Sequence, residues 1–345
     1  MNDSHSDISP ALDLTEQLLV DQEPSAATSV TDVYRAHSRA DPSHFFAVKR
    51  LRFQDNRSKE LASERRHTIA KDIESLSRVQ HDNLLPFSGV CRIKEDLCIV
   101  TPWAEGGTLA KWLPQHVDAN RVQIVASAMN YLHTPIKEKA AIVHGNLHSA
   151  NVLMDDKSNA MVCDFGLYGL TPDAYDASIA WTADSQPRGK YTYMAPELLQ
   201  QGVPRSANSD MYSFGVLTWE VYAGSPPFPD RGALARMLAL SKGERPVRGD
   251  VKRADFSDAI WSIVDSCWAH NPAVRPPMHV VHDRFVEMAA KSGNPPSDRS
   301  WLDGEALDRG LGRFVWNAMR VAFVSAWEML TEKVLWKSTQ RLGSR

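Results

Sequence analysis

The sequence predicts an α+β fold of two lobes, a small β-rich lobe followed by a larger helical one. Alternating β-branched and aromatic residues recur up to about residue 103, whereas the pattern after the Gly106-Gly107 break is mainly helical. The chain has 345 residues, of which 43% are apolar, and this is enough to build a sizeable core. We therefore expect one two-lobed domain with a short appendage.

The small lobe should contain several strands and one helix. Residues 45–49 form an apolar run that ends in a lysine and is typical of a buried strand. Residues 58–80 place three apolar side chains on one helical face and predict an amphipathic helix. Segments 84–91 and 96–103 again have the pattern of strands. The three apolar positions of the helix are Ile69, Ile73 and Leu76.

Charge, cysteine content and hydropathy exclude several classes of protein. The formal net charge of −3 gives no basic excess for binding nucleic acid. The four cysteines form no CxxC pair, which argues against a zinc site or a disulfide framework. The N-terminus lacks the positive charge and apolar run of a signal peptide, and no stretch approaches about 18 apolar residues. We expect a cytoplasmic protein.

Three phrases carry a resemblance to protein kinases. They read His-Asp-Asn-Leu-Leu-Pro-Phe-Ser-Gly-Val at 81–90, His-Gly-Asn-Leu-His-Ser-Ala-Asn-Val-Leu at 144–153 and Tyr-Met-Ala-Pro-Glu-Leu-Leu at 193–199. In this order and spacing they are very specific. The chain resembles the tyrosine-kinase-like group of serine/threonine kinases, particularly its fungal branch. The resemblance implies a kinase-like domain at 12–290, with an N-lobe at about 12–103 and a C-lobe at about 104–290.

The resemblance implies that Lys49 holds the α- and β-phosphates of ATP. In a kinase this lysine pairs with a helical glutamate, and counting back from His81 places that position at Asp72. Glu74 has the family's residue type but lies two positions along the helix, about 200° away. Either the shorter carboxylate of Asp72 pairs with Lys49 or no ion pair forms.

Two oxygen donors stand where the family binds Mg²⁺. Asp164 lies in an Asp-Phe-Gly tripeptide, and Asn151 precedes it at the position of the second metal ligand. Both are short oxygen donors of the kind that a hard cation requires. ATP and Mg²⁺ are therefore the implied cofactors. The other nucleotide-binding positions implied by the resemblance are Val33, Ala47, Thr101, Pro102, Ala104 and Leu153.

The catalytic loop departs from the family pattern. A kinase uses an aspartate to accept the proton of the substrate hydroxyl, and this chain has Asn146 at that position. An amide can bond a hydroxyl but is not a useful base at neutral pH. The same His-Gly-Asn triplet occurs in the regulatory pseudokinase domains of the Janus kinases, to which the chain is similar in this respect only. We expect impaired phosphate transfer.

The loop that covers the phosphates is also changed. Its family pattern needs three glycines so that the backbone can approach the phosphates without side-chain obstruction. Counting from Val33, those positions hold Ala26, Thr28 and Thr31. We expect a β-hairpin whose side chains face the triphosphate.

The supports of the fold are present. The resemblance implies an apolar stack through both lobes, anchored by Asp210, and a buried ion pair between Glu197 and Arg275. Gly145 replaces the arginine that receives an activation-segment phosphate, so modification of Tyr191, Thr192 or Tyr193 should not activate in the usual way. The residues of the stack are Leu76, Phe87, His144 and Phe165.

Residues outside the domain form three regions. We expect an N-terminal tail at 1–11, a linker at 291–299 and a helical extension at 300–345. The extension is basic and amphipathic, and we expect its aromatic face to pack on the large lobe; a partner groove or an anionic membrane surface is the alternative. Its apolar positions are Trp316, Phe323, Trp327, Leu330 and Val334.

Three functions are compatible with these patterns. The leading hypothesis is a pseudokinase that binds nucleotide weakly and acts on a protein partner, such as an active kinase or signalling complex. The second is an active ATP-dependent serine/threonine kinase that Asn146 only slows. The third is a membrane or complex adaptor that works through residues 300–345. Measured phosphate transfer separates the first two, and removal of residues 300–345 tests the third.

Overall fold

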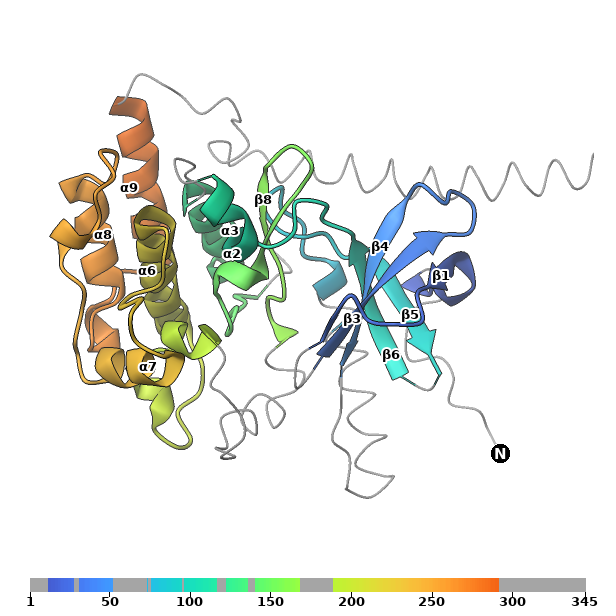
Figure 1. The fold of residues 1–345 in the computed structure, drawn as a ribbon, viewed down its shortest axis with the longest axis horizontal. Helices are drawn as coiled ribbons and strands as arrows, with labels where there is room; N and C mark the ends of the chain where they lie inside the picture. Colours follow the sequence, from blue (N-terminus) through green and yellow to red (C-terminus); the bar gives the residue numbers. More distant parts are fainter. Residues whose placement is uncertain are drawn as a thin grey trace, which may run out of the picture.

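The computed structural model describes residues 12–27, 31–51, 73, 76–94, 96–116, 122–135, 140–167 and 189–291. A small lobe built on a β-sheet lies beside a larger, mainly helical lobe (Figure 1). The predicted α+β architecture is confirmed. Several predictions fall on residues outside the described part of the chain. They concern residues 1–11, Thr28, Asp72, Glu74, the linker from 292 and the extension 300–345.

The small lobe contains one antiparallel sheet. Its strands follow the order β1-β3-β4-β6-β5, and β2 pairs with the other part of β3. Each strand lies beside a neighbour that is close in sequence, as short connections favour. The strands are β1 (Leu18–Val20), β2 (Ala26–Ala27), β3 (Thr31–Ser38), β4 (Phe45–Leu51), β5 (Gly89–Ile93) and β6 (Asp96–Pro102).

The two faces of this sheet have different neighbours. Because strand side chains alternate, Tyr34, Val48 and Val100 share one face, where they form a cluster with other buried residues. Leu51 and Ile99 lie on the opposite face, in a cluster that faces the helical segment before residue 79. We call this second face the inner face, and its cluster also includes Leu167 of the large lobe.

One predicted strand begins later than expected, and one predicted helix lies mostly outside the described residues. The strand expected at 84–91 is wrong at its start, because only Gly89 onward joins the sheet. Pro86 lacks the N–H that a ladder needs, and Leu84 instead bridges Val162 of the large lobe. The helix expected at 58–80 lies mostly outside the described residues, but Leu76 within it is helical.

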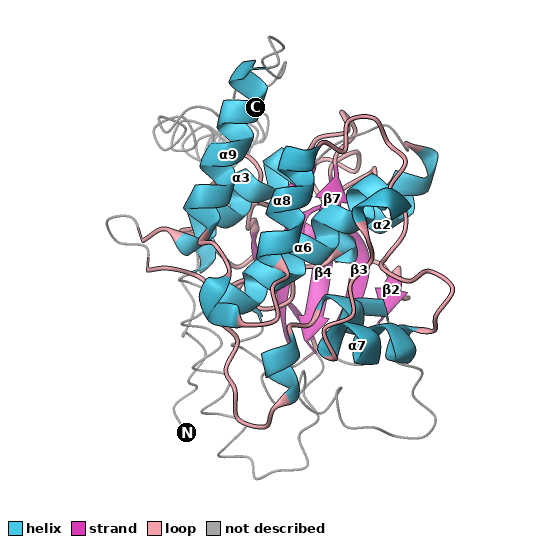
Figure 2. Ribbon diagram, turned by 90° about the vertical axis from the view of Figure 1, so that its left-hand side faces the viewer, coloured by secondary structure: helices cyan, strands magenta, loops and turns pink. Residues whose placement is uncertain are grey.

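The large lobe is built around α6 (Ala207–Ala223), which is buried on nearly all sides. Every residue from Ser209 to Tyr222 is buried, and the helix is fixed by a Ser206–Ser209 capping box and a left-handed Gly224. Figure 2 shows α6, α8 and α9 in front of the strands. The other helices are α2 (Leu109–Trp112), α3 (Val122–His133), α7 (Ala233–Ser241), α8 (Asp258–Cys267) and α9 (Met278–Lys291).

Shorter elements connect these helices. A two-stranded sheet of β7 (Val152–Met154) and β8 (Ala160–Val162) lies at the boundary with the small lobe. In the described part of the chain, no helix combines the length and apolar character needed to cross a bilayer. The 3₁₀ helices are η2 (Thr15–Gln17), η3 (Leu113–Gln115), η4 (Ser149–Asn151), η5 (Gly189–Tyr193), η6 (Pro196–Leu199), η7 (Arg248–Asp250) and η8 (Pro272–Val274).

Candidate functional site

Strand register brings four of the predicted nucleotide-binding residues onto one face of the small sheet, whereas Pro102 pairs with Phe46 on the other face. Val33 lies opposite Lys49, and Ala47 lies opposite Thr101. All four alternate with the residues of the outer cluster, so they point to the inner face. Leu153, on β7, comes from the large lobe and is half-buried. The predicted positions therefore come from both lobes.

Lys49 forms an ion pair with Asp164 across the two lobes. Its Nζ donates to both carboxylate oxygens, and the side chains of both residues are 18% exposed. Asp164 has a backbone φ of +63°, which is sparsely populated for residues other than glycine and is typical of functional sites. The structure thus joins two residues that the sequence assigned to phosphate and metal binding.

The β7–β8 hairpin places Asn151 near Asp164. Asn151 directly precedes β7, Asp164 follows β8, and Val152 pairs with Val162, so both lie at the same end of the hairpin. The backbone N–H of Cys163 donates to the carbonyl of Asn151 across 2.9 Å and closes this end. The side-chain amide of Asn151 donates to the carbonyl of Asn146 at 2.9 Å.

Asp210 fixes the catalytic loop from below. Its carboxylate accepts hydrogen bonds from the backbone N–H groups of His144 and Gly145, both at 2.8 Å. A ring nitrogen of His133 lies 2.9 Å from the same carboxylate. Gly145 has a φ of +76°, a conformation that glycine adopts without strain. Its carbonyl accepts from Arg205 at 2.6 Å.

His144 is fully buried at the centre of this arrangement. Burial lowers the pKa of its imidazole, although the charge of Asp210 acts in the opposite direction. The backbone N–H of Asn146 donates to Nδ1 of His144 at 3.3 Å, which leaves the proton on Nε2. Among the described residues, that Nε2 has no hydrogen-bond partner. The ring therefore serves packing and the shape of the loop.

Asn146 occupies the predicted catalytic position in a loop of regular shape. It is half-buried, and its backbone N–H and carbonyl both bond within the loop, to His144 and Asn151. An amide in this place can donate to or accept from a hydroxyl, but it carries no charge at neutral pH. The change at this position therefore affects the chemistry of the side chain and leaves the backbone arrangement in place.

The hinge between the lobes keeps one backbone donor available. The N–H of Trp103 donates to the carbonyl of Phe45 at 3.2 Å, and Pro102 has no N–H. Within the described residues, the N–H of Ala104 donates to no acceptor. Ala104 is the predicted donor to adenine, and its N–H is therefore free to serve that purpose.

An arginine that the sequence reasoning missed lies next to the hinge. The guanidinium of Arg35 lies 3.8 Å from the centre of the Phe45 ring and 5.4 Å from that of Trp103. It also contacts Glu105 at 3.4 Å. Arg35 shares the inner face with Val33 because the two are separated by one residue. That alternation was the one signal in the sequence that pointed to it.

The segment predicted to cover the phosphates, which we call the phosphate roof, contains the paired strands β2 and β3. Ala26 pairs with Val33 and Ala27 with Asp32, so β2 and β3 are antiparallel. Ala26 is exposed and Thr31 is buried. Both carry the Cβ atoms that the family's glycines lack, as the sequence predicts.

The predicted supports of the two lobes are in place. Leu76 packs against the large-lobe core and the inner cluster of the small lobe, and its Cδ2 lies 3.0 Å from where a Cβ on Gly166 would be. Arg275 donates to both oxygens of Glu197 at 2.7 Å, with its side chain fully buried. Phe165 belongs to the large-lobe core, and Phe87 packs against the inner cluster.

A buried polar network that the sequence did not predict holds the activation segment. Tyr193 donates to Glu220 on α6, and Ser149 donates to the same carboxylate at 3.1 Å. Burial raises the pKa of Glu220, while these two hydrogen bonds lower it. Thr192 is also buried, so Thr192 and Tyr193 are both withdrawn from modifying enzymes in this conformation.

The donor set fits Mg²⁺ bound with a nucleotide. No group of three or more His, Cys, Asp or Glu that could hold a metal occurs among the described residues. Asn151 uses its amide nitrogen for Asn146, which leaves its oxygen as a ligand beside the carboxylate of Asp164. A hard cation that keeps waters and phosphates as its other ligands needs only one or two such oxygens.

Comparisons with known proteins agree with this geometry. The family model "Protein tyrosine and serine/threonine kinase" matches residues 26–285. Serine/threonine-protein kinase CTR1 of Arabidopsis thaliana is 31% identical over 74% of this chain and 30% of its own length. Mitogen-activated protein kinase kinase kinase 10 of Mus musculus is 30% identical over 71% of this chain and 25% of its own length. The chain thus spans less than a third of these two relatives.

Proposed function

Because the chain belongs to the protein tyrosine and serine/threonine kinase family, we propose that it is a kinase-fold signalling module with impaired phosphate transfer and weak nucleotide binding. Asn146 is the observation that carries this proposal. The residue stands at the position of the catalytic base, within a loop whose backbone bonds are complete. Positioned acid or base catalysis contributes roughly 10²- to 10⁴-fold, and an amide cannot supply it.

The remaining parts support retained nucleotide binding. Lys49 would contact the phosphates, Asp164 and Asn151 would hold Mg²⁺, and the N–H of Ala104 would bond adenine. When bound, the metal neutralises phosphate charge. The changed roof at Ala26 and Thr31 argues for weak binding, because their side chains stand where the family has bare backbone.

The module would act through a protein partner. The lobes meet through the Lys49–Asp164 pair and through Leu76, so a nucleotide that displaces Lys49 from Asp164 would change how the lobes are held. An active kinase or a signalling complex is the partner that this proposal names. Cytoplasmic location stays a prediction. Contact of residues 300–345 with an anionic membrane surface is likewise still a prediction.

A transfer assay on the whole chain tests the proposal. Labelled γ-phosphate is offered with Mg²⁺ to the protein itself and to a generic protein substrate, with Asp164→Ala as the blank. The expected transfer equals that of the blank. Transfer clearly above it would support the alternative, an active serine/threonine kinase with an unusual catalytic loop, for which the intact Lys49–Asp164 and Asn151 arrangement is the supporting observation.

A further inference from the structure

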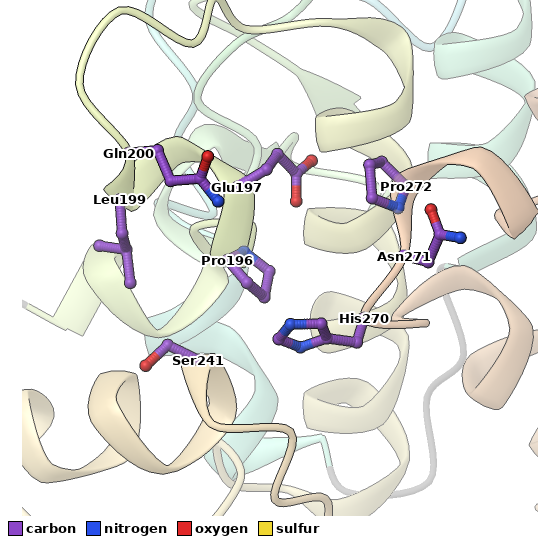
Figure 3. Close-up of a pocket in the computed structure, with 8 residues that line it drawn as sticks. All are labelled: Pro196, Glu197, Leu199, Gln200, Ser241, His270, Asn271 and Pro272. Atoms are coloured by element: carbon purple, nitrogen blue, oxygen red, sulfur yellow. The ribbon is translucent and has the colours of Figure 1, made fainter.

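A pocket on the large lobe lies apart from the nucleotide site. It has a volume of about 340 Å³, near the lower end for ligand pockets and suited to one large side chain. Figure 3 shows the ring of His270 pointing into the space between Pro196 and Ser241. The lining residues come from η6 and the residue after it, the end of α7, and the segment that leads into the first residue of η8. They are Pro196, Glu197, Leu199, Gln200, Ser241, His270, Asn271 and Pro272.

Exposed aliphatic residues occur in the segments that form this pocket. Of the five large apolar side chains that are exposed in the described part of the chain, one lines the pocket and two are close in sequence to residues that line it. Leu199 lines it and is 41% exposed, Leu238 is one helical turn before Ser241, and Val274 follows Pro272 by two residues. Exposed apolar residues at a hollow are typical of an interaction surface.

The pocket offers no unpaired charge to a ligand. Its carboxylate, Glu197, is bonded at both oxygens by the fully buried Arg275. The remaining polar lining groups are the uncharged side chains of Gln200, Ser241 and Asn271, together with His270. An apolar or aromatic side chain therefore fits this surface better than a phosphate or a carboxylate.

We propose that the chain's own C-terminal segment occupies this pocket, with a tryptophan of residues 300–345 inserted beside His270. Trp316, Phe323 and Trp327 recur at helical spacing and would otherwise form a large exposed apolar patch. An indole is small enough to enter a pocket of about 340 Å³. The proposal does not depend on nucleotide binding or on the loss of catalysis.

The chain is long enough to make this contact. The pocket residues Asn271 and Pro272 lie just before α9, and the segment leaves from its far end at Lys291. Figures 1 and 2 both show the C-terminal end of α9 at the opposite side of the large lobe from α7. Helix α9 has 14 residues and is about 21 Å long. The 25 residues from Lys291 to Trp316 can span about 80 Å when extended, which is ample.

Tethering favours this occupant over a second copy of the chain, and net charge is compatible with it. A flexible tether keeps a segment at an effective concentration on the order of millimolar, so a weak contact is still occupied. Residues 300–345 contain seven Lys and Arg and five Asp and Glu, a net charge of +2. The rest of the chain contains the remaining 32 Lys and Arg and 37 Asp and Glu, a net charge of −5. The segment is therefore positive and the body negative.

Crosslinking in the whole chain tests the contact directly. A photoreactive phenylalanine analogue placed at position 316 or 327 should crosslink to residues 196–200, 241 or 270–272 of the same molecule. Crosslinks to other parts of the same chain would overturn the proposal. Crosslinked dimers that disappear on dilution would overturn it in favour of a second copy.

Limited trypsin digestion supplies the variant test. Leu199→Glu, or Ser241→Trp to fill the pocket, should speed cleavage within residues 313–341 by about tenfold, which corresponds to about 1.4 kcal/mol. Leu19→Glu is the matched control, because Leu19 is 40% exposed but lies on β1 of the small lobe. Equal rates in Leu199→Glu and Leu19→Glu would contradict the proposal, as would cleavage of the wild-type segment at the rate of a free peptide.

Discussion

The side-chain amide of Asn151 donates to the backbone carbonyl of Asn146 across 2.9 Å. The residue at the metal-ligand position therefore also fixes the residue at the catalytic-base position. Asp210 holds the same loop through the N–H groups of His144 and Gly145. Because this frame is complete, an asparagine in place of the family's aspartate changes the side-chain chemistry and leaves the backbone of the loop in place.

Repair of the catalytic base alone should restore little activity. Asn146→Asp returns the base, which supplies roughly 10²- to 10⁴-fold, but the γ-phosphate stays poorly held under a roof without glycines. Transfer of labelled γ-phosphate should therefore rise only slightly above the Asp164→Ala blank. The full repair should yield far more than the separate gains, because groups that act as one unit are not additive. It combines Asn146→Asp with Ala26→Gly, Thr28→Gly, Thr31→Gly and Asp72→Glu.

This prediction has a clear contrary result. Strong transfer by Asn146→Asp alone would show that Ala26 and Thr31 do not hinder the nucleotide. Thr31 is buried at the start of β3, so its change to glycine will itself cost stability. Thermal unfolding of the combined variant must first confirm that it is folded at the assay temperature.

Nucleotide binding should depend on Lys49. ATP with Mg²⁺ at 100 times its dissociation constant should stabilise the protein by about 2.7 kcal/mol, seen as a rise in melting temperature. Lys49→Ala should abolish this rise because it removes the ammonium that contacts the phosphates. Lys242→Ala, on the exposed surface after α7, should keep it. A rise that persists in Lys49→Ala would show that nucleotide binds elsewhere or without this lysine.

The buried Arg275 should contribute far more to stability than an exposed arginine in a similar pair. Arg275→Ala leaves the Glu197 carboxylate without its partner and should lower the free energy of unfolding by about 3–5 kcal/mol. Arg231 bonds Glu244 at the same 2.7 Å, but both side chains are more than 40% exposed. Arg231→Ala should cost about 1 kcal/mol or less. Urea denaturation at neutral pH compares them, and equal losses would contradict the assignment.

Stability should fall between pH 6.5 and about pH 4 because of His81. Burial, and secondly the charge of His282, lowers the pKa of His81 from 6.5 to about 4. In this window the unfolded chain binds a proton at His81 and the folded chain does not, so stability is lost as pH falls. The loss from this residue should be about 3 kcal/mol at most.

Two histidine variants isolate this effect. His81→Asn keeps an acceptor for the N–H of Asn83 but does not titrate, so its free energy of unfolding should depend less on pH. His279→Asn, on the exposed side of α9, should keep the wild-type pH dependence. The same slope in His81→Asn and wild type would show that the half-buried His81 imidazole does not control acid stability.

Much of the candidate site could be predicted because catalytic motifs consist of local residue patterns. Lys49 at the end of an apolar strand, the Asp-Phe-Gly at 164–166 and the changed triplet at 144–146 are each visible within a few residues. The predicted start of β5 was wrong, because the apolar Leu84 and Leu85 look like a strand but serve contacts with the large lobe.

Other features could not be predicted because they depend on residues distant in sequence. Ser149, Tyr193 and Glu220 come from three separate segments, and only packing around α6 makes them one buried network. Arg35 looks like an ordinary strand residue until Phe45 and Trp103 are placed beside it. The pocket beside Leu199 is likewise formed by three loops and helix ends.

The sequence by itself determined the family, the two-lobed fold and the residues Lys49, Asn146, Asn151 and Asp164, because each belongs to a short motif with a fixed chemical purpose. Only the tertiary structure decided which of them touch. Lys49 and Asp164 are 115 positions apart, and their ion pair requires the register of β4 and the end of β8 to coincide. A local pattern can specify a side chain, but a contact between lobes depends on how both lobes pack.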